Sequence, residues 1–409
     1  MNTLLIVALT LGLAWAQAEL EEVYGWKQME FAWPDEKTKQ DALQSGAYIP
    51  ENNLPLGIQK WKNKLFVTVP RWKAGVAASL NVLDTDKPNK TAALVPYPDW
   101  TANTLPPAGA EKVPDNTVVS VFRTRVDVCD RLWVMDTGLA DILGEPRQIT
   151  KPALVIFDLN TDKLIRRYEF KATDLKEDSF FANVVVDVTP DRCDKAYAYV
   201  PDLGGYGVVV YSLAENDSWR VTHNFFHFDP LKGDLTVGGV NFQWTDGVFG
   251  LALSEPKANG QRLMYFHALA STKEFSVPTG VLQNKTLATD PHNYYMFKLE
   301  GDRGHNTQAT SSAYDERTKI LFLTQLNKDG AACWNTQRGL SPSSLGTIAK
   351  DPERLIFTND IMLADDYVYM LSDKMSLFLY KSLQPDEVNY RIMRIKVQDA
   401  IRGTPCAGY

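Results

Sequence analysis

The segment LWVMDTG, residues 132–138, alternates large side chains and ends in a polar turn, which is typical of a β-strand in a packed sheet. Similar segments recur along the chain. They begin at Leu65 (LFVTVPR), Leu132 (LWVMDTG), Tyr197 (YAYVPDLGG), Leu263 (LMYFHAL), Ile320 (ILFLTQL) and Tyr367 (YVYMLSD). These six copies stand 47 to 67 residues apart, so one unit repeats through most of the chain.

Further strand-like segments flank the repeated unit. They are expected after a copy at 79–83, 153–159, 208–213 and 377–380, and before a copy at 184–188, 248–253 and 361–363. Three or four short strands in a repeat of this length are typical of a propeller blade. A blade cannot bury both of its faces alone, so neighbouring blades must stack and the ring must close. The sequence predicts an all-β, six-bladed propeller with a central channel.

The composition supports one large domain. The chain has 409 residues, of which 44% are hydrophobic and 23% charged, enough for a sizeable core. Two β-sandwiches would be the alternative, but no Pro/Gly/Ser linker divides the repeats. We therefore expect a single propeller domain over residues 19–409.

The formal net charge is −7 and we find no basic stripe, which argues against a nucleic-acid partner.

The first eighteen residues have the pattern of a secretory signal peptide. Residues 4–15 form a largely apolar run, and Ala16-Gln17-Ala18 is a small-x-small cleavage site. A buried first helix is the alternative interpretation. No other run has the length of a membrane span, so we expect a signal peptide at 1–18 and a soluble, secreted protein without a membrane partner.

The cysteines and the sequons fit an extracellular compartment. Four cysteines allow three pairings, and we favour Cys129–Cys193 with Cys333–Cys406, neighbours in sequence order. None stands in a CxxC pair, so we expect no zinc site. Candidate glycosylation sites lie at Asn89, Asn216 and Asn284, each in an N-x-S/T sequon.

Several motifs resemble the Yellow / major royal jelly protein family. They are YGWK at 24–27, LFVTVPR at 65–71, PYPDW at 96–100, CDRLWVMDTG at 129–138, DSW at 217–219, GVFG at 247–250, SSA at 311–313, CWNT at 333–336 and YRIMR at 390–394. They follow the family's order over nearly the whole mature chain. The absence of a long repetitive tail makes the chain most similar to an insect Yellow-type member.

The resemblance carries expectations about fold and function. The family fold is a six-bladed propeller, in agreement with the repeat count. Some relatives are secreted proteins that bind serotonin and catecholamines in the central channel. Others are linked to cuticle pigmentation, and a few to conversion of dopachrome. Family membership therefore implies the fold more firmly than the function.

Three site residues follow from the resemblance. In the amine-binding relatives the ligand is contacted by a Thr of the last blade and by an Asn and a Phe after the next strand. The matching positions here are Asn359, Asp373 and Met375, and a one-residue shift would place Thr358 first. Asp373 could pair with an ammonium, whereas Met375 replaces a stacking ring with a thioether. Asp373 could equally cap its own turn.

Other candidates stand just past blade strands. Asp360 and Phe249 are taken as further ligand-contacting residues, beside Asp136, Asp202 and Phe181. Turn aspartates often satisfy nearby backbone amides instead, and Phe249 could be a core residue. A central calcium, as in lactonase-like propellers, would need Asn183, Asn359 and Asp360, but no Glu joins them. We therefore expect no metal and no cofactor.

The leading hypothesis is an extracellular, monomeric binder of small aromatic amines or catechols. The first alternative is a dopachrome-converting isomerase of melanin formation, although none of the five histidines stands out as a base. The second alternative is a non-catalytic cuticle or eggshell component that acts through an extracellular matrix. We expect a binding protein rather than an enzyme.

Overall fold

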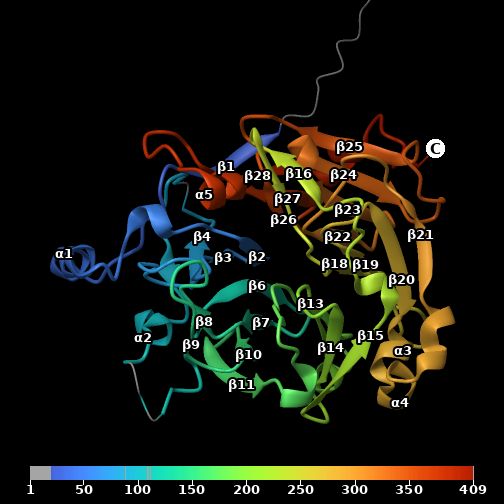
Figure 1. Ribbon diagram of the computed structural model, residues 1–409, viewed down its shortest axis with the longest axis horizontal. Helices are drawn as coiled ribbons and strands as arrows, with labels where there is room; N and C mark the ends of the chain where they lie inside the picture. Colours follow the sequence, from blue (N-terminus) through green and yellow to red (C-terminus); the bar gives the residue numbers. More distant parts are fainter. Residues whose placement is uncertain (1–19, 88, 108–109, 111, 409) are drawn as a thin grey trace, which may run out of the picture.

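A computed structural model describes residues 20–87, 89–107, 110 and 112–408. The expected signal peptide lies outside the described residues. Six four-stranded antiparallel sheets surround a common centre, in the order of the chain (Figure 1). The architecture is the predicted six-bladed propeller. No helix in the described part of the chain combines the length and apolar character needed to cross a bilayer.

Each blade runs from an innermost strand to an outermost one. Blade 1 contains β2 (Gly57–Trp61), β3 (Lys64–Thr68), β4 (Leu80–Asp84) and β5 (Val95–Pro96). Blade 2 contains β6 (Val121–Val126), β7 (Arg131–Asp136), β10 (Ala153–Asp158) and β11 (Lys163–Glu169). Blade 3 contains β12 (Val185–Asp187), β13 (Tyr197–Asp202), β14 (Gly207–Ser212) and β15 (Asp217–Thr222).

The remaining blades complete the ring. Blade 4 contains β18 (Val248–Leu253), β19 (Leu263–Ala268), β20 (Lys273–Pro278) and β21 (Lys298–Asp302). Blade 5 contains β22 (Ser312–Asp315), β23 (Ile320–Gln325), β24 (Gly330–Asn335) and β25 (Leu345–Lys350). Blade 6 contains β26 (Thr358–Ala364), β27 (Tyr367–Ser372), β28 (Tyr390–Lys396) and β1 (Glu21–Trp26).

The repeated segment of the sequence is the second strand of every blade. All six copies fall on β3, β7, β13, β19, β23 and β27. These strands are mostly buried, because they lie inside a sheet whose two faces pack against neighbouring blades. The large alternating side chains therefore fill the spaces between blades, which explains why they recur once per blade.

Short elements between the strands cover the channel mouths and the rim. The hairpins are β8 (Leu139–Ala140) with β9 (Arg147–Gln148), and β16 (Asp234–Val237) with β17 (Val240–Gln243). The helices are α1 (Glu36–Ser45), α2 (Trp100–Asn103), α3 (Thr279–Gln283), α4 (Lys285–Ala288), α5 (Met375–Tyr380) and α6 (Val397–Ile401). The strand expected at 377–380 is wrong: this apolar run forms α5, because four apolar residues do not distinguish a short strand from a helix.

Blade 6 joins the two ends of the described chain. Its outermost strand β1 pairs antiparallel with β28, and Figure 1 shows the blue strand beside the red one. We call the β1–β28 pairing the seam, and Arg394 forms a 2.7 Å ion pair with Glu21 across it. Tyr24 and Trp26 are buried in the largest hydrophobic cluster, with exposed fractions of 3% and 2%. The ring is thus closed by hydrogen bonds, a salt bridge and two buried aromatic rings.

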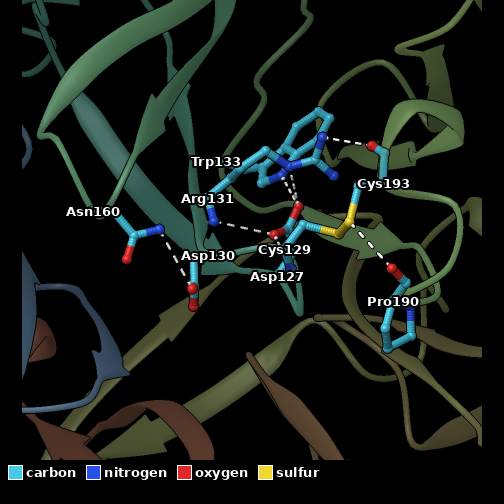
Figure 2. Close-up of a disulfide and its surroundings, with 8 residues drawn as sticks. All are labelled: Asp127, Cys129, Asp130, Arg131, Trp133, Asn160, Pro190 and Cys193. Carbon is cyan, nitrogen blue, oxygen red and sulfur yellow. Dashed lines mark hydrogen bonds and ion pairs between the residues drawn. A yellow bond between two sulfur atoms is a disulfide. The ribbon is translucent and has the colours of Figure 1, made fainter.

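The favoured cysteine pairings are confirmed. Cys129 and Cys193, with sulfurs 2.01 Å apart, link blade 2 to blade 3 (Figure 2). Beside them the Asp127 carboxylate accepts hydrogen bonds from Arg131 Nε and Trp133 Nε1, both at 2.7 Å. Arg131 Nη1 also donates to the Cys193 carbonyl at 2.6 Å, so a polar network braces the disulfide.

The second disulfide fastens the C-terminal tail. Cys406, which follows α6, is bonded to Cys333 of β24 with a sulfur distance of 2.04 Å. Both cysteines are fully buried. The three sequon residues Asn89, Asn216 and Asn284 are all exposed, as a glycan acceptor must be.

Candidate functional site

A cavity of about 540 Å³ opens at one mouth of the channel, where the innermost strands begin. This volume suits a small organic ligand. Its walls come from the first residues of innermost strands and from loops, and all six blades contribute. The lining residues are Leu56, Trp72, Lys73, Phe122, Leu143, Phe180, Ala182, Leu203, Trp244, Asp246, Phe249, Leu269, Thr310, Phe357, Asn359, Met375, Leu379 and Tyr380. We call this space the upper cavity.

Three aromatic rings from different blades form one wall. Trp72 stacks on Phe180 with ring centroids 6.0 Å apart and planes inclined by 26°. Phe122 meets both rings edge-on, at centroid distances of 5.0 and 4.9 Å. Such an arrangement presents flat apolar surface to a ligand while the rings hold one another in place. The wall is suited to an aromatic or quinonoid ring.

The rim of the cavity is also aromatic. Trp244, between β17 and β18, donates its indole N–H to the hydroxyl of Tyr380 at 2.7 Å. Tyr380 and Leu143 remain about half exposed, at 49% and 48%. The rim therefore combines α5 of blade 6 with loops of blades 2 and 4.

Asp246 is the acidic residue of the upper cavity. Its backbone carbonyl accepts from Ala270 N at 3.1 Å, which fixes the turn before β18. Its carboxyl group makes no hydrogen bond or ion pair with any described residue. Burial raises the pKa of Asp246 to about 6, because little water reaches the charged form. An unpaired carboxyl group with such a pKa can pair with a cation or exchange a proton near neutral pH.

Lys73 is the cationic lining residue. Its ammonium lies 4.1 Å from the centroid of the Phe378 ring and donates to the Phe378 carbonyl at 3.3 Å. Burial lowers the pKa of Lys73. The cavity thus offers one carboxyl and one ammonium group against walls that are otherwise mainly apolar.

The floor of the cavity is a hydrogen-bonded network around Asn359. Its amide nitrogen donates to the Asp373 carboxyl at 2.8 Å and lies 3.4 Å from the Met375 sulfur. Its amide oxygen accepts from Arg123 Nη2 at 3.0 Å. Asp373 is fully buried, and burial raises its pKa well above the ordinary value. The network fixes the orientation of Asn359 at the cavity surface.

Arg123 and Asp360 form an ion pair next to Asn359, behind the lining of the upper cavity. Arg123 Nε lies 3.2 Å from Asp360 Oδ1, and both side chains are almost fully buried. The guanidinium also lies 5.0 Å from the centroid of the Phe249 ring. A guanidinium beside Asp360 disfavours a calcium ion there. Among the described residues, no group of three His, Cys, Asp or Glu side chains is placed to hold a metal.

The structure brings together only part of the set proposed from the sequence. Asn359, Met375 and Phe249 line the upper cavity. Asp373 lies behind Asn359 and also accepts from the Met375 backbone N–H at 3.0 Å, so it supports the floor and does not line the cavity. Asp360 is likewise engaged below the floor. The alternative Thr358 is buried and donates to the Leu355 carbonyl at 3.0 Å.

Two of the turn aspartates serve the backbone. Asp136 accepts from the amides of Val119 and Ser120 at 3.0 and 2.8 Å. Asp202 accepts from the Phe180 amide at 2.8 Å and forms a 2.8 Å ion pair with Arg220. These contacts follow the ordinary behaviour of turn aspartates.

Sequence reasoning missed the main polar group and most of the aromatic wall. Asp246 directly precedes the motif GVFG, so reading that motif one residue earlier would have included it. Phe181 was singled out, but it is buried in a hydrophobic cluster, and its neighbour Phe180 lines the cavity. Trp72 and Trp244 lie in loops whose paths the strand pattern does not specify.

Comparisons with known proteins agree on one family. The model of the family described as "Major royal jelly protein" matches residues 119–406. The chain is 40% identical over 399 residues to a dopaminechrome tautomerase of Drosophila melanogaster, covering 96% of this chain and 85% of that protein. It is 38% identical over 397 residues to Protein yellow of the same species, covering 96% and 72%.

A solved structure supports the fold. A Bacteroides thetaiotaomicron protein of unknown function superposes with a TM-score of 0.50 at 9% identity, over 92% of this chain and 75% of that one. At this identity the likeness concerns the fold alone.

Proposed function

Because this chain belongs to the Yellow / major royal jelly protein family, we propose that it binds catechol-derived ring compounds in the upper cavity and tautomerises aminochromes such as dopaminechrome. The observation that carries the proposal is the unpaired Asp246 carboxyl group inside an aromatic cavity. The name of the relative with 40% identity supports the substrate class.

The chemistry requires proton transfer and no redox partner. Tautomerisation of an aminochrome moves protons from saturated ring carbons to quinone oxygens within one molecule, so it consumes no oxidant. It needs a base near the ring carbons and a donor near the oxygens. We assign the base to Asp246, whose pKa of about 6 leaves it largely ionised at pH 7. Lys73 is the candidate that stabilises charge on the quinone oxygens.

The cavity walls supply the positioning. Trp72, Phe122 and Phe180 offer a surface against which a flat ring packs. Asn359, held by Asp373 and Arg123, presents a fixed polar group at the floor. A fixed ring keeps its acidic carbon within reach of a single base, and positioning of this kind contributes much of the acceleration in many enzymes.

The first test is turnover of dopaminechrome. We expect the wild-type protein to speed loss of the visible aminochrome colour, and Asp246→Asn to slow it by about a hundredfold or more, as removal of a general base does. The matched control is Asp386→Asn, which removes an exposed carboxyl group that does not line the upper cavity. Equal rates with and without wild-type protein would refute the tautomerase proposal.

The second candidate function is amine binding without turnover. A carboxylate beside aromatic faces is also the usual way to hold an ammonium on a flat ring. Calorimetry with dopamine, serotonin and octopamine tests this alternative. Binding that Asp246→Asn weakens, together with no effect on dopaminechrome, would favour a carrier over an enzyme. No binding and no turnover would favour a cuticle or eggshell component.

We further propose that the protein is a secreted, glycosylated monomer. Two disulfides and three exposed sequon residues support an extracellular compartment. Residues 1–18 supply the proposed signal peptide. Mass spectrometry of protein from culture medium, before and after glycosidase treatment, tests cleavage after Ala18 and occupancy at Asn89, Asn216 and Asn284.

A further inference from the structure

A second cavity, of about 320 Å³, lies at the opposite mouth of the channel. On each innermost strand its lining residues lie further along the chain than those of the upper cavity; Arg125 follows Phe122 on β6, and Leu251 follows Phe249 on β18. The lining residues are Gln59, Arg125, Val126, Val185, Val186, Leu251, Ala252, Leu253, Ser312, Ala313, Tyr314, Glu316 and Leu363. We call this space the lower cavity. The two cavities share no lining residue, and the paired Arg123 and Asp360 line neither of them.

We propose that the lower cavity is a second ligand site, which binds the carboxylate of a small organic acid through Arg125, Gln59 and Ser312. The proposal does not depend on the function assigned to the upper cavity. It rests on three polar side chains that converge on one space and lack partners for their polar ends.

Arg125 is the centre of the site. It is two residues beyond Arg123 on β6, and it lines the lower cavity. Its Nε donates to the Val184 carbonyl at a long 3.4 Å, and it forms no ion pair. Burial lowers the pKa of Arg125, which reflects the loss of water around a charged group. A partly buried guanidinium without a carboxylate is costly unless a ligand supplies one.

The nearby carboxylates are already engaged. Asp360 pairs with Arg123 and accepts hydrogen bonds from the Ile58 amide and the Ser311 hydroxyl. Glu316, which lines the lower cavity, is held by Arg262 at 2.6 Å. Asp187 is held by the same arginine at 3.1 Å. The Asp360 charge acts on Arg125 from a distance, but none of these acids forms an ion pair with Arg125.

Ser312 and Gln59 provide independent support. Ser312 is 1% exposed, and its hydroxyl has no hydrogen-bond partner among the described residues. The Gln59 side chain is 7% exposed, and its amide makes no hydrogen bond with described groups. Buried polar groups in native proteins are nearly always paired. The Nη groups of Arg125 on β6, the Gln59 amide on β2 and the Ser312 hydroxyl on β22 thus border one cavity with donors that no described residue engages, which points to a shared acceptor.

The chemistry of the acceptor follows from these donors. A guanidinium binds a carboxylate through two parallel N–H groups, and a hydroxyl and an amide N–H can complete its oxygen shell. The cavity volume, near the lower end for ligand sites, fits an acid of about the size of benzoate. The exposed side of Tyr314 and the aliphatic strand residues can contact its apolar part.

The test is calorimetry of the mature protein with sodium acetate, benzoate and sulfate at low chloride concentration. We expect a carboxylate to bind more tightly than sulfate, and Arg125→Gln to weaken it by about tenfold to a hundredfold, the range for a hydrogen-bonded charged group. Arg147→Gln, which removes an exposed arginine of β9, is the matched control and should bind as wild type.

A second variant distinguishes a loss of ligand binding from a loss of folding. Ser312→Ala removes a hydroxyl that has no partner, so we expect an unchanged or higher melting temperature and severalfold weaker binding. Three outcomes would overturn the proposal: no heat with any of the three anions, sulfate binding without carboxylate binding, or carboxylate binding that neither Arg125→Gln nor Ser312→Ala weakens.

Discussion

Three carboxyl groups near the channel have different chemical roles because their surroundings differ. Asp360 faces Arg123 and accepts several hydrogen bonds, which leaves it in a structural ion pair. Asp373 is sealed behind Asn359, where burial raises its pKa strongly. Burial also raises the pKa of Asp246, but its carboxyl group borders a cavity and has no partner among the described residues. Asp246 is therefore the carboxyl group available to a ligand.

The pKa of Asp246 predicts how tautomerase activity depends on pH. A base must be ionised, so kcat/KM for dopaminechrome should rise with pH through an apparent pKa of about 6 and level off above pH 7. Rates measured between pH 4.5 and 7.5 give this profile. A flat profile over that range would exclude Asp246 as the base.

The same shift predicts an effect on stability. The folded pKa of about 6 lies above the ordinary value of 3.8, so ionised Asp246 opposes folding. The resulting loss of folding free energy is absent below pH 3.8, grows as the pH rises, and reaches its full size above pH 6. We expect Asp246→Asn to stabilise the protein at pH 7 by on the order of 1 to 3 kcal/mol.

Chemical denaturation at pH 7 and at pH 3.5 measures this difference. The two proteins should differ at pH 7 and converge at pH 3.5. A variant that is less stable than wild type at pH 7 would mean that the carboxylate has a stabilising partner.

At the scale of single elements, insertions between strands create the site. Helix α5 contributes Met375, Leu379 and Tyr380 to the upper cavity, and the loop before β18 contributes Trp244 and Asp246. The blades themselves supply only the first residues of their innermost strands. Family members can therefore change ligands by altering these loops while the blade cores stay the same.

The tail disulfide predicts a measurable loss of stability. Replacing Cys333 and Cys406 together with alanine opens a loop of 73 residues, which the chain-entropy treatment values at about 4 kcal/mol. Chemical denaturation should show a loss of that order, and limited proteolysis should cut near α6 first. The matched pair Cys129→Ala with Cys193→Ala opens a loop of 64 residues and should cost about as much. An unchanged denaturation midpoint in either variant would contradict this account.

At the scale of the whole molecule, stability depends on closing the ring. Blade 6 takes β1 from the start of the described chain and β26–β28 from its end. The seam buries Tyr24 and Trp26, and truncating a buried aromatic side chain costs about 3 to 5 kcal/mol. Two such losses are comparable to the entire stability of an ordinary domain.

Removal of β1 should therefore prevent stable closure. We compare a mature chain that starts at Glu21 with one that starts at Lys27, so that only β1 differs. The shorter chain should lose its cooperative thermal transition and form oligomers through the exposed edge of β28, as seen by size-exclusion chromatography. A monomeric shorter chain with the same melting temperature would show that β1 is dispensable.

The sequence by itself determined the propeller and the blade count, whereas the disulfide pairing that it only favoured was established by the structure. The reason is that alternating apolar strands such as 132–138 bury the same faces in every blade, and this local pattern repeats. The sequence also indicated three residues that line the upper cavity: Asn359 and Met375 through the family resemblance, and Phe249 through its place near a blade strand.

Only the tertiary structure decided which polar groups meet. Trp72 and Lys73 come from one loop of blade 1 and Asp246 from the loop before β18 of blade 4, and closure of the ring brings them to one mouth. The same closure places Arg123 beside Asp360, 237 residues later in the chain, and leaves Arg125 without an ion pair. Burial and pairing depend on these long-range neighbours, which no local pattern specifies.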